Sequence, residues 1–299
     1  MTAQTPDWIA SDWGTTHLRV WAMSHSGTVL AQASSDQGMN KLTKDQFAGA
    51  LLDLVGTWVT KPTPVIACGM VGSRQGWSEA AYATVPCDAT ATGFASVPAF
   101  HDHLSVHIIP GLRQNRPADV MRGEETQIAG FLALNPKWDG VICLPGTHTK
   151  WVHVSANEVV SFQTAMTGDL FAAISGHTVL KHSITDGWDA EGFAQGLDDA
   201  ISRPEKLAAR LFSLRAEGLL DGLPNAVARA RLSGLLIGAE LAATKPYWLG
   251  QQVAVIGAGT LAKIYVDALA TQGVAATQAD GDRATRAGLT AAYRRFKES

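Results

Sequence analysis

The sequence predicts an α/β protein built from two similar halves, and three observations support this fold class. Each half begins with a β-ribbon and continues with alternating helices and short apolar strands. A Gly-Thr turn joins the first two strands of each ribbon, at Gly14–His17 and Gly146–Thr149. The 299 residues suffice for two domains with separate cores. We expect domains of residues 1–137 and 138–299, and we allow the last helix to pack back on the first domain.

The composition excludes several classes of protein. With 46% hydrophobic and 17% charged residues, the chain is globular rather than disordered. A net charge of −3 gives no reason to expect nucleic acid or an anionic membrane surface as a partner. No apolar run approaches the roughly 18 residues that span a bilayer, and the N-terminal residues do not resemble a signal peptide. Three cysteines without metal-type spacing favour a reduced, cytoplasmic protein.

The first half contains the expected elements in the order three strands, helix, strand, strand, helix. The strands are expected at 9–13, 17–21, 28–33, 64–68 and 106–109. Thr43–Gln46 fits a capping box, and apolar residues at helical spacing follow it. A glycine-rich loop, residues 69–77, follows the fourth strand, and a helix that starts with Glu124 ends at Asn135-Pro136.

The second half repeats this order with an added helical region. Three strands are expected at 141–145, 150–155 and 159–165, and a mostly helical region at 168–244. The remaining elements are a strand at 252–257, a helix with Leu261 and Leu269 on one face, a strand at 274–279 and a helix from Asp282.

The two Gly-Thr turns are candidate phosphate-binding loops. Such a turn can aim successive backbone N–H groups and threonine hydroxyls at one anion. A single turn is weak evidence, because hairpins use Gly and Thr for backbone reasons alone, but two copies at corresponding places favour a ligand. Asp12 would then hold Mg²⁺, through water because this ion dehydrates reluctantly. The predicted phosphate contacts are Gly14, Thr15, Thr16, Gly146, Thr147, His148 and Lys150.

A third glycine motif, Gly257-Ala-Gly259, lies between a strand and a helix and has two interpretations. As the start of Gly-x-Gly-x-x-Ala, running to Ala262 and with Asp280 about 20 residues on, it fits a dinucleotide-binding turn. That interpretation predicts an NAD(P)-dependent oxidoreductase, but it leaves both Gly-Thr ribbons unexplained. Alternatively, Gly257 and Gly259 let the chain pass close to an adenosine.

In this order the three stretches resemble the phosphate-1, phosphate-2 and adenosine motifs of the actin/Hsp70/sugar-kinase superfamily. This resemblance implies two ribonuclease-H-like (actin-like ATPase) domains around a central cleft. Six motifs look like signatures of the 2-dehydro-3-deoxygalactonokinase family: Ser11–Thr16, Ala67–Ser73, Val120–Gln127, Leu144–Trp151, Ala165–Gly168 and Ser233–Glu240. The family resemblance implies Mg-ATP-dependent phosphorylation of the 6-hydroxyl of 2-dehydro-3-deoxy-D-galactonate, a step of galactonate catabolism. Asp169 stands where the family pattern leads us to expect Glu, so its role stays open, as does that of Glu240.

Such a kinase needs a carboxylate that accepts the proton of the sugar hydroxyl. In sugar kinases of this superfamily the acid often begins the helix between the two phosphate loops, the place of Glu124 and Glu125. Acids in a first turn also simply complement the helix dipole. Asp12 is the other candidate, and we assign it to the metal because it adjoins the phosphate turn. Which carboxylate acts as the base stays open.

The acid substrate also needs a group that binds its carboxylate, and arginine suits this role through its two-pronged donors. Arg74 and Arg122 are the best-placed candidates, and Arg113 is a weaker one. The other residues expected to line the sugar-acid pocket are Gly69, Met70, Ser73, Trp77, Thr167 and Asp169. A metal site at His101, His103 and His107 is disfavoured, because Asp102 is the only neighbouring acid.

Three alternatives to this function stay open at the level of sequence. They are the oxidoreductase, a kinase of another 2-keto-3-deoxy sugar acid, and a non-catalytic nucleotide-binding protein of the actin/Hsp70 type. The preferred sugar-acid epimer depends on one hydroxyl, which loop sequences do not reveal. The chain is compatible with a homo-oligomer, but the sequence does not specify an oligomeric state.

Overall fold

The computed structural model describes residues 5–90, 93–257 and 259–298, which form two compact units. The first unit comprises the residues up to Asp139, Val154–Phe162 and the residues from Ala279. The second comprises Gly140–His153 and Gln163–Gln278. These units are sets of residues in mutual contact and are not continuous in sequence. The expected domain boundary after residue 137 therefore stays a prediction.

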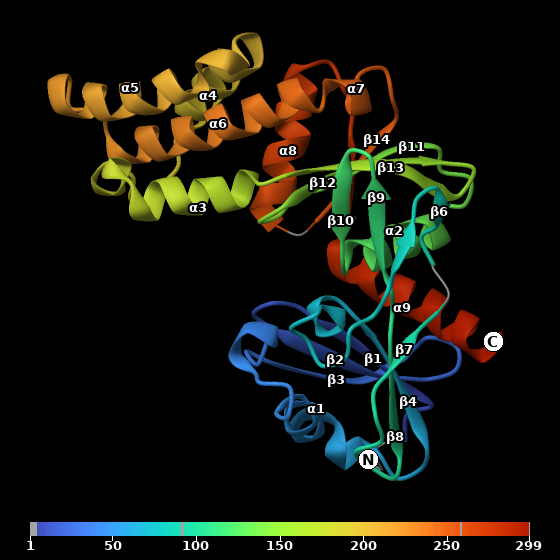
Figure 1. Ribbon diagram of the computed structural model, residues 1–299. Coiled ribbons are helices and arrows are strands. Elements are labelled where there is room, and N and C mark those ends of the chain that lie inside the picture. Colours follow the sequence, from blue (N-terminus) through green and yellow to red (C-terminus); the bar gives the residue numbers. More distant parts are fainter. Residues whose placement is uncertain (1–4, 91–92, 258, 299) are drawn as a thin grey trace. The chain divides into compact units, whose positions relative to one another are not determined.

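The first sheet has the strand order β3-β2-β1-β4-β8-β7 (Figure 1). Its strands are β1 (Trp8–Trp13), β2 (Leu18–Met23), β3 (Val29–Ser35), β4 (Thr63–Cys68), β8 (Leu104–Ile108) and β7 (Ala95–Ser96). Strand β1 is antiparallel to β2 and parallel to β4. Alternate residues of β1 supply two cores: Ile9 and Trp13 pack with α1 (Phe47–Val55), whereas Trp8 and Ala10 pack with α9 (Gly281–Glu298). The strand is therefore buried on both faces.

The same order recurs in the sheet β15-β14-β11-β12-β13-β6. Its strands are β11 (Gly140–Leu144), β12 (Thr149–Ser155), β13 (Glu158–Ala165), β14 (Val253–Ile256), β15 (Thr277–Ala279) and β6 (Cys87–Asp88). Leaving out β7 and β6 and numbering the other five strands of each sheet in chain order, the first sheet reads third, second, first, fourth, fifth. The second sheet reads the same when it is taken from β13 to β15. This repeat confirms the prediction of two halves with one architecture.

The helices pack closely where glycines face each other. Helix α2 (Glu124–Leu134) lies against α9 so tightly that a Cβ atom on Gly288 would lie 1.8 Å from the carbonyl oxygen of Thr126. Helices α4 (Ala190–Ser202) and α6 (Asn225–Ala243) make the same kind of contact, since a Cβ on Gly234 would lie 2.3 Å from the oxygen of Phe193. Both helix pairs therefore depend on glycine, because any side chain at these positions would prevent the close approach.

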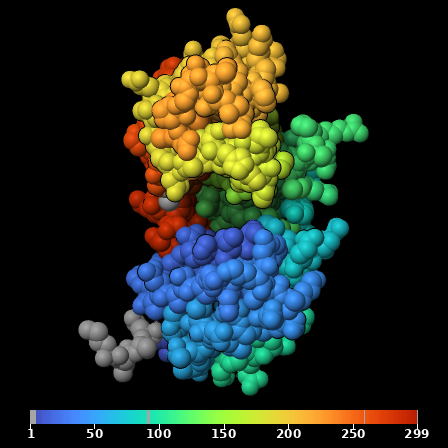
Figure 2. Space-filling model, turned by 90° about the vertical axis from the view of Figure 1, so that its left-hand side faces the viewer, coloured from blue at the N-terminus to red at the C-terminus, as the bar shows by residue number. Residues whose placement is uncertain are grey.

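The remaining helices of the second unit are α3 (Thr167–His177), α5 (Leu207–Leu220), α7 (Lys245–Trp248) and α8 (Gly259–Thr271). In the space-filling view the light orange atoms near the top include α5, which lies at the surface (Figure 2). Its side chains Phe212, Leu219 and Leu220 are exposed. Short 3₁₀ helices are η1 (Met39–Lys41), η2 (Gly56–Trp58), η3 (Met70–Gly72), η4 (Val179–His182) and η5 (Pro204–Lys206). Among the described residues, no helix combines the length and the apolar character that crossing a membrane requires.

Two local predictions differ from the structure. Residues 78–121 contain a third sheet, in the order β10-β9-β5, formed by β5 (Tyr82–Thr84), β9 (Gly111–Asn115) and β10 (Ala118–Met121). These strands have only three to five residues, too few to show the apolar alternation that marks a strand. Helix α1 begins at Phe47 rather than directly after Thr43, although the side chain of Gln46 accepts a hydrogen bond from the Thr43 N–H at 2.8 Å as a capping box requires.

Replacing Gly288 with alanine should destabilise the first unit by several kcal/mol, because the new methyl group would overlap the backbone of α2. Gly49→Ala in α1 is the matched control, since no atom lies within 4 Å of its added Cβ. The control should stabilise α1 by up to about 1 kcal/mol, because alanine favours a helix over glycine. Urea unfolding measures both, and equal stabilities for the two variants would contradict the close packing of α2 and α9.

Candidate active site

The first Gly-Thr turn is held by backbone hydrogen bonds. The N–H of Gly14 donates to the oxygen of His17 at 2.9 Å, which closes the β1–β2 hairpin. The carbonyls of Gly14, Thr15 and Thr16 accept from Met39, Asn40 and Gly38 in and beside η1. These bonds fix the turn from one side, while the side chains of Thr15 and Thr16 are exposed.

Asp12, at the end of β1, is paired with an arginine that the sequence analysis did not single out. Arg19 lies opposite Asp12 in the hairpin, and its Nη2 donates to Asp12 Oδ2 at 2.5 Å. Arg19 also donates to Asp282 at the start of α9, at 2.5 Å. Burial lowers the pKa of Arg19, but the charge of Asp12 and the bonds to both carboxylates outweigh burial and raise it. The sequence could have indicated this pair, because residues seven apart across a short hairpin can lie opposite each other.

The start of α2 adds a buried carboxylate to this region. Glu125 is fully buried and accepts from the Gly123 N–H at 2.6 Å and from Thr126 Oγ1 at 3.0 Å. Burial, reinforced by the charge of Glu124, raises the pKa of Glu125 to about 7. The thiol of Cys68 lies 3.7 Å from Asp12, and its pKa is raised by burial and then by the charges of Asp12 and Glu125. Asp12 and Glu125 therefore influence the same buried group.

Glycines bring the loop after β4 onto the start of α2. Gly69 has a φ of +92°, and a Cβ there would lie 2.7 Å from the carbonyl oxygen of Trp13. A Cβ on Gly123 would lie 3.3 Å from the Cα of Gly69. The end of β1, the loop after β4 and the start of α2 are thus in backbone contact, as expected at the carboxyl edge of parallel strands.

Of the three candidate arginines, Arg122 has the unusual environment. It is buried, its Nη2 donates to the oxygen of Ala80 at 2.8 Å, and its guanidinium lies 4.3 Å from the centre of the Tyr82 ring. In the part of the chain that the structure describes, its buried Nε and Nη1 have no hydrogen-bond partner. By contrast, Arg74 is exposed beside Glu79, and Arg113 is exposed and donates to Thr84. Because unpaired buried donors are costly, Arg122 is the candidate that most needs an anion.

Other residues assigned to the sugar-acid pocket have contacts within the first unit. The ring of Trp77 packs against Trp13, Phe47 and Phe100. Ser73 Oγ lies 3.0 Å from the sulfur of Met39. Met70 is half-buried in η3. These contacts within the protein explain the positions of the side chains even in the absence of a ligand. The role of these residues in substrate binding therefore stays a prediction.

The second Gly-Thr turn is held by the start of α3. A Cβ on Gly168 would lie 2.6 Å from the oxygen of Gly146, so the two backbones touch. The N–H of Asp169 donates to the oxygen of Thr147 at 3.1 Å, and its carboxylate lies 2.6 Å from Nε2 of His148. Asp169 thus contacts the turn itself. Lys150, in β12, is buried.

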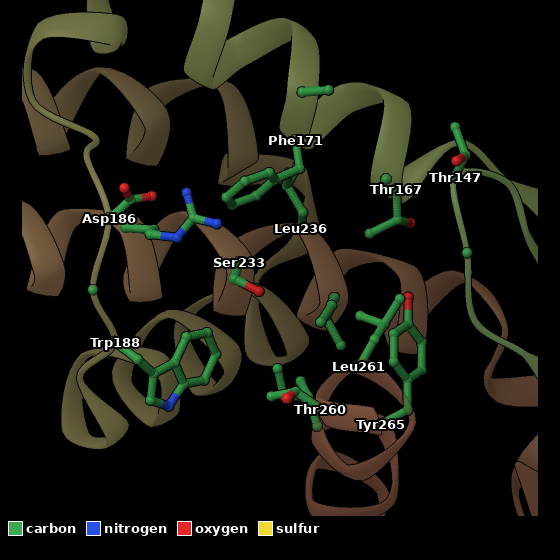
Figure 3. Close-up of a pocket in the computed structure, with 17 residues that line it drawn as sticks. Thr147, Thr167, Phe171, Asp186, Trp188, Ser233, Leu236, Thr260, Leu261 and Tyr265 are labelled. Atoms are coloured by element: carbon green, nitrogen blue, oxygen red, sulfur yellow. The ribbon is translucent and has the colours of Figure 1, made fainter. Parts of the chain in front are cut away.

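A cavity of about 660 Å³ extends from this turn through the second unit. In Figure 3, Thr147 and Thr167 lie at one end and Asp186 and Trp188 at the other. Arg229 and Phe171 also line the cavity, and the guanidinium of Arg229 lies 5.0 Å from the centre of the Phe171 ring. A volume in this range and a mainly apolar lining with a few polar groups are typical of small-molecule sites.

The third glycine motif borders this cavity. Gly259, with a φ of +65°, begins α8, and the next residues, Thr260 and Leu261, line the cavity. A Cβ on Gly257 would lie 3.3 Å from that of Ala262; Ala258, between the two glycines, lies outside the described residues. Asp280 accepts from the N–H of Arg283 at 2.6 Å, which places its carboxylate at the start of α9.

Metal ligands are sparse. No group of three or more His, Cys, Asp or Glu side chains within residues 5–90, 93–257 and 259–298 could hold a metal ion. One oxygen of Asp12 is bound by Arg19 and the other faces a thiol. Both oxygens of Asp12 thus have a protein neighbour, and the expectation that Asp12 holds Mg²⁺ through water stays a prediction.

Comparison with known proteins identifies the family. The family model described as 2-keto-3-deoxy-galactonokinase matches residues 12–292. The chain belongs to this family. It is 42% identical over 298 residues to a probable 2-dehydro-3-deoxygalactonokinase of Rhizobium meliloti (strain 1021), covering 95% of this chain and 96% of the relative. It is 36% identical over 294 residues to the 2-dehydro-3-deoxygalactonokinase of Escherichia coli (strain K12), covering 95% and 97%.

Solved structures agree with this family and with its fold. The crystal structure of a protein assigned as 2-dehydro-3-deoxygalactonokinase from Sinorhizobium meliloti has a TM-score of 0.91 at 38% identity and covers 97% of this chain and 99% of that one. The activator of the 2-hydroxyisocaproyl-CoA dehydratase from Clostridium difficile, with bound ADPNP, has a TM-score of 0.50 at 13% identity over 97% and 96%, which shows the fold alone. The chain thus has the predicted actin-like ATPase architecture and is a sugar-acid kinase, not an oxidoreductase.

Ionisation of Glu125 should make stability depend on pH. Its pKa of about 7 lies above the ordinary 4.5, so the native state holds an extra proton between these values and stability falls as pH rises through this window. The shift corresponds to about 3 kcal/mol. Glu125→Gln should remove this dependence, as measured by unfolding between pH 4.5 and 8. A wild-type stability that rises over this window would contradict a raised pKa.

Proposed function

We propose that this chain transfers the γ-phosphoryl group of ATP to the 6-hydroxyl of 2-dehydro-3-deoxy-D-galactonate. The observation that carries the proposal is its identity of 42% and 36%, over nearly the full length, to proteins named for this activity. The cavity that extends from the Gly146–Thr149 turn through the second unit supports it, because an elongated nucleotide has phosphates at one end and a base at the other. The phosphates would lie at Gly146 and Thr147, and the base toward Asp186 and Trp188.

In this proposal the first unit binds the sugar acid. Arg122 would hold the substrate carboxylate, since its buried guanidinium has donors that lack a partner among the described residues. The pair Glu124–Glu125 would accept the proton of the attacking hydroxyl. Glu124 would face the substrate, because its side chain is half-buried whereas that of Glu125 is fully buried. Glu125 itself, with a pKa of about 7, lies close to the pH at which a general base works best.

Asp12 would position Mg²⁺ through water, and Arg19 would hold the carboxylate of Asp12 in place. When bound, the metal neutralises charge on the phosphates during transfer. The Gly14–His17 turn would offer its threonine hydroxyls to a phosphate group. We also propose a cytoplasmic location, because Cys68, Cys87 and Cys143 are all free thiols. The oligomeric state and the absence of a nucleic-acid partner stay predictions.

A coupled assay of ADP release across a panel of 2-keto-3-deoxy sugar acids tests the function. Wild-type protein should turn over the galactonate-derived acid faster than the gluconate-derived epimer. Asp12→Asn should lower kcat by at least about 100-fold, because a misplaced metal forfeits several kcal/mol of charge stabilisation. ATP hydrolysis that no sugar acid accelerates would contradict the proposed function. Near-normal turnover by Asp12→Asn would show that Asp12 has no essential role in the reaction.

Arg122→Ala should raise KM for the sugar acid by about 100-fold, the equivalent of two charge-assisted hydrogen bonds, and leave KM for ATP within about twofold. Arg122→Lys keeps the charge but loses the two-pronged geometry, so it should recover only part of the loss. Arg74→Ala is the matched control, because this exposed side chain belongs to the neighbouring loop. If Arg74→Ala has the larger effect on the sugar acid, Arg74 holds the substrate carboxylate instead.

A further inference from the structure

Glu240 is a second buried carboxylate, and it lies behind the wall of the cavity. Only 5% of the residue is exposed, on α6. One carboxylate oxygen accepts from Trp151 Nε1 at 2.8 Å; the other accepts from Tyr265 Oη at 2.9 Å and from Thr167 Oγ1. Burial raises the pKa of Glu240, and the hydrogen bonds oppose that rise. Three donors converge on the carboxylate, which is the condition under which a buried carboxylate is tolerated.

These donors come from three elements that are distant in sequence. Trp151 lies on β12, Thr167 begins α3, and Tyr265 lies on α8. Thr167 and Tyr265 themselves line the cavity (Figure 3). Thr149, the first residue of β12, extends the network, since its hydroxyl lies 3.1 Å from that of Tyr265. Glu240 therefore joins its own helix to three other elements at this end of the cavity.

The network also reaches the phosphate turn through the backbone. Gly168, which follows Thr167, touches the backbone of Gly146 and Thr147, and Asp169 donates to the oxygen of Thr147. A shift of Thr167 must therefore move the residues that hold the turn. Trp151 Nε1 is a donor without acceptor capacity, so the oxygen that meets it must stay an acceptor. A carboxylate satisfies all three donors at once, whereas an amide would reverse the hydrogen bonds of both hydroxyls.

We propose that Glu240 is a positioning residue for the nucleotide: it fixes Thr167, and through it the Gly146–Thr147 turn, together with the Tyr265 wall of the cavity. Glu240 does not contact the ligand. This inference rests on the proposed function, because it takes the cavity to be the ATP site. It assigns a role to the one acid of the Ser233–Glu240 motif, which the sequence left open.

Titration calorimetry of intact protein with Mg-ATP tests the inference, combined with KM measurements for both substrates. Glu240→Gln keeps the volume, and it should raise the Kd for ATP about tenfold, the equivalent of one hydrogen bond to a charged group. KM for the sugar acid should stay within about twofold. Thr167→Val should produce a similar loss of affinity, because it keeps the shape of threonine but removes the hydroxyl. Thr167→Ser keeps the hydroxyl that donates to Glu240, so it should lose less affinity for ATP than Thr167→Val.

Glu217→Gln is the matched control for a merely structural effect. Glu217 on α5 pairs with the buried Arg231 of α6, so its removal disturbs the same helix away from the cavity. This control should lower the melting temperature and leave the Kd for ATP unchanged. An unchanged Kd in folded Glu240→Gln, an unchanged Kd in Thr167→Val, or an equal loss in Glu217→Gln would overturn the positioning role. Failure of the wild type to bind ATP would instead defeat the proposed function.

Discussion

Backbone contact at glycines is the constraint on which both parts of the candidate site depend. In the first unit, Gly69 and Gly123 bring the loop after β4 onto the start of α2. In the second, Gly168 brings α3 onto the Gly146–Thr147 turn. A Cβ atom on Gly168 would lie 2.6 Å from the carbonyl oxygen of Gly146, which is shorter than the van der Waals contact distance of carbon and oxygen. The glycines therefore determine how near the functional groups of each unit come to one another.

The buried carboxylates of the two units differ in how they are satisfied. Glu125 accepts two short-range bonds from its own helix start, beside a second acid, and its pKa rises to about 7. Glu240 accepts three bonds from other elements. The first arrangement leaves a group whose pKa lies near neutral pH. The second ties several elements together. Similar burial thus gives a titratable group in one unit and a hydrogen-bonded junction between elements in the other.

Sequence reasoning succeeded where the signal is local. The two Gly-Thr turns, the apolar strands beside them and the start of α2 at Glu124 follow from residue periodicity and turn chemistry, and the structure has these elements. The strands β5, β9 and β10 were missed because each has only three to five residues, too few for a periodic pattern. The partners of Glu240 were beyond reach for another reason. Trp151 and Thr167 lie 89 and 73 residues away, and only the folded chain brings them together.

The packing of α9 on α2 has a consequence for the order in which the protein matures. The chain enters the second unit after residue 139 and returns to the first only from Ala279, apart from Val154–Phe162. A ribosome therefore completes the whole second unit before it releases the helix that covers Gly130 and the face of α2 around it. Until then, the apolar residues Trp8 and Ala10 lack the Leu289 and Tyr293 against which they pack. The nascent first unit is therefore left with an open core until the last residues have been made, and such exposed apolar surface favours aggregation.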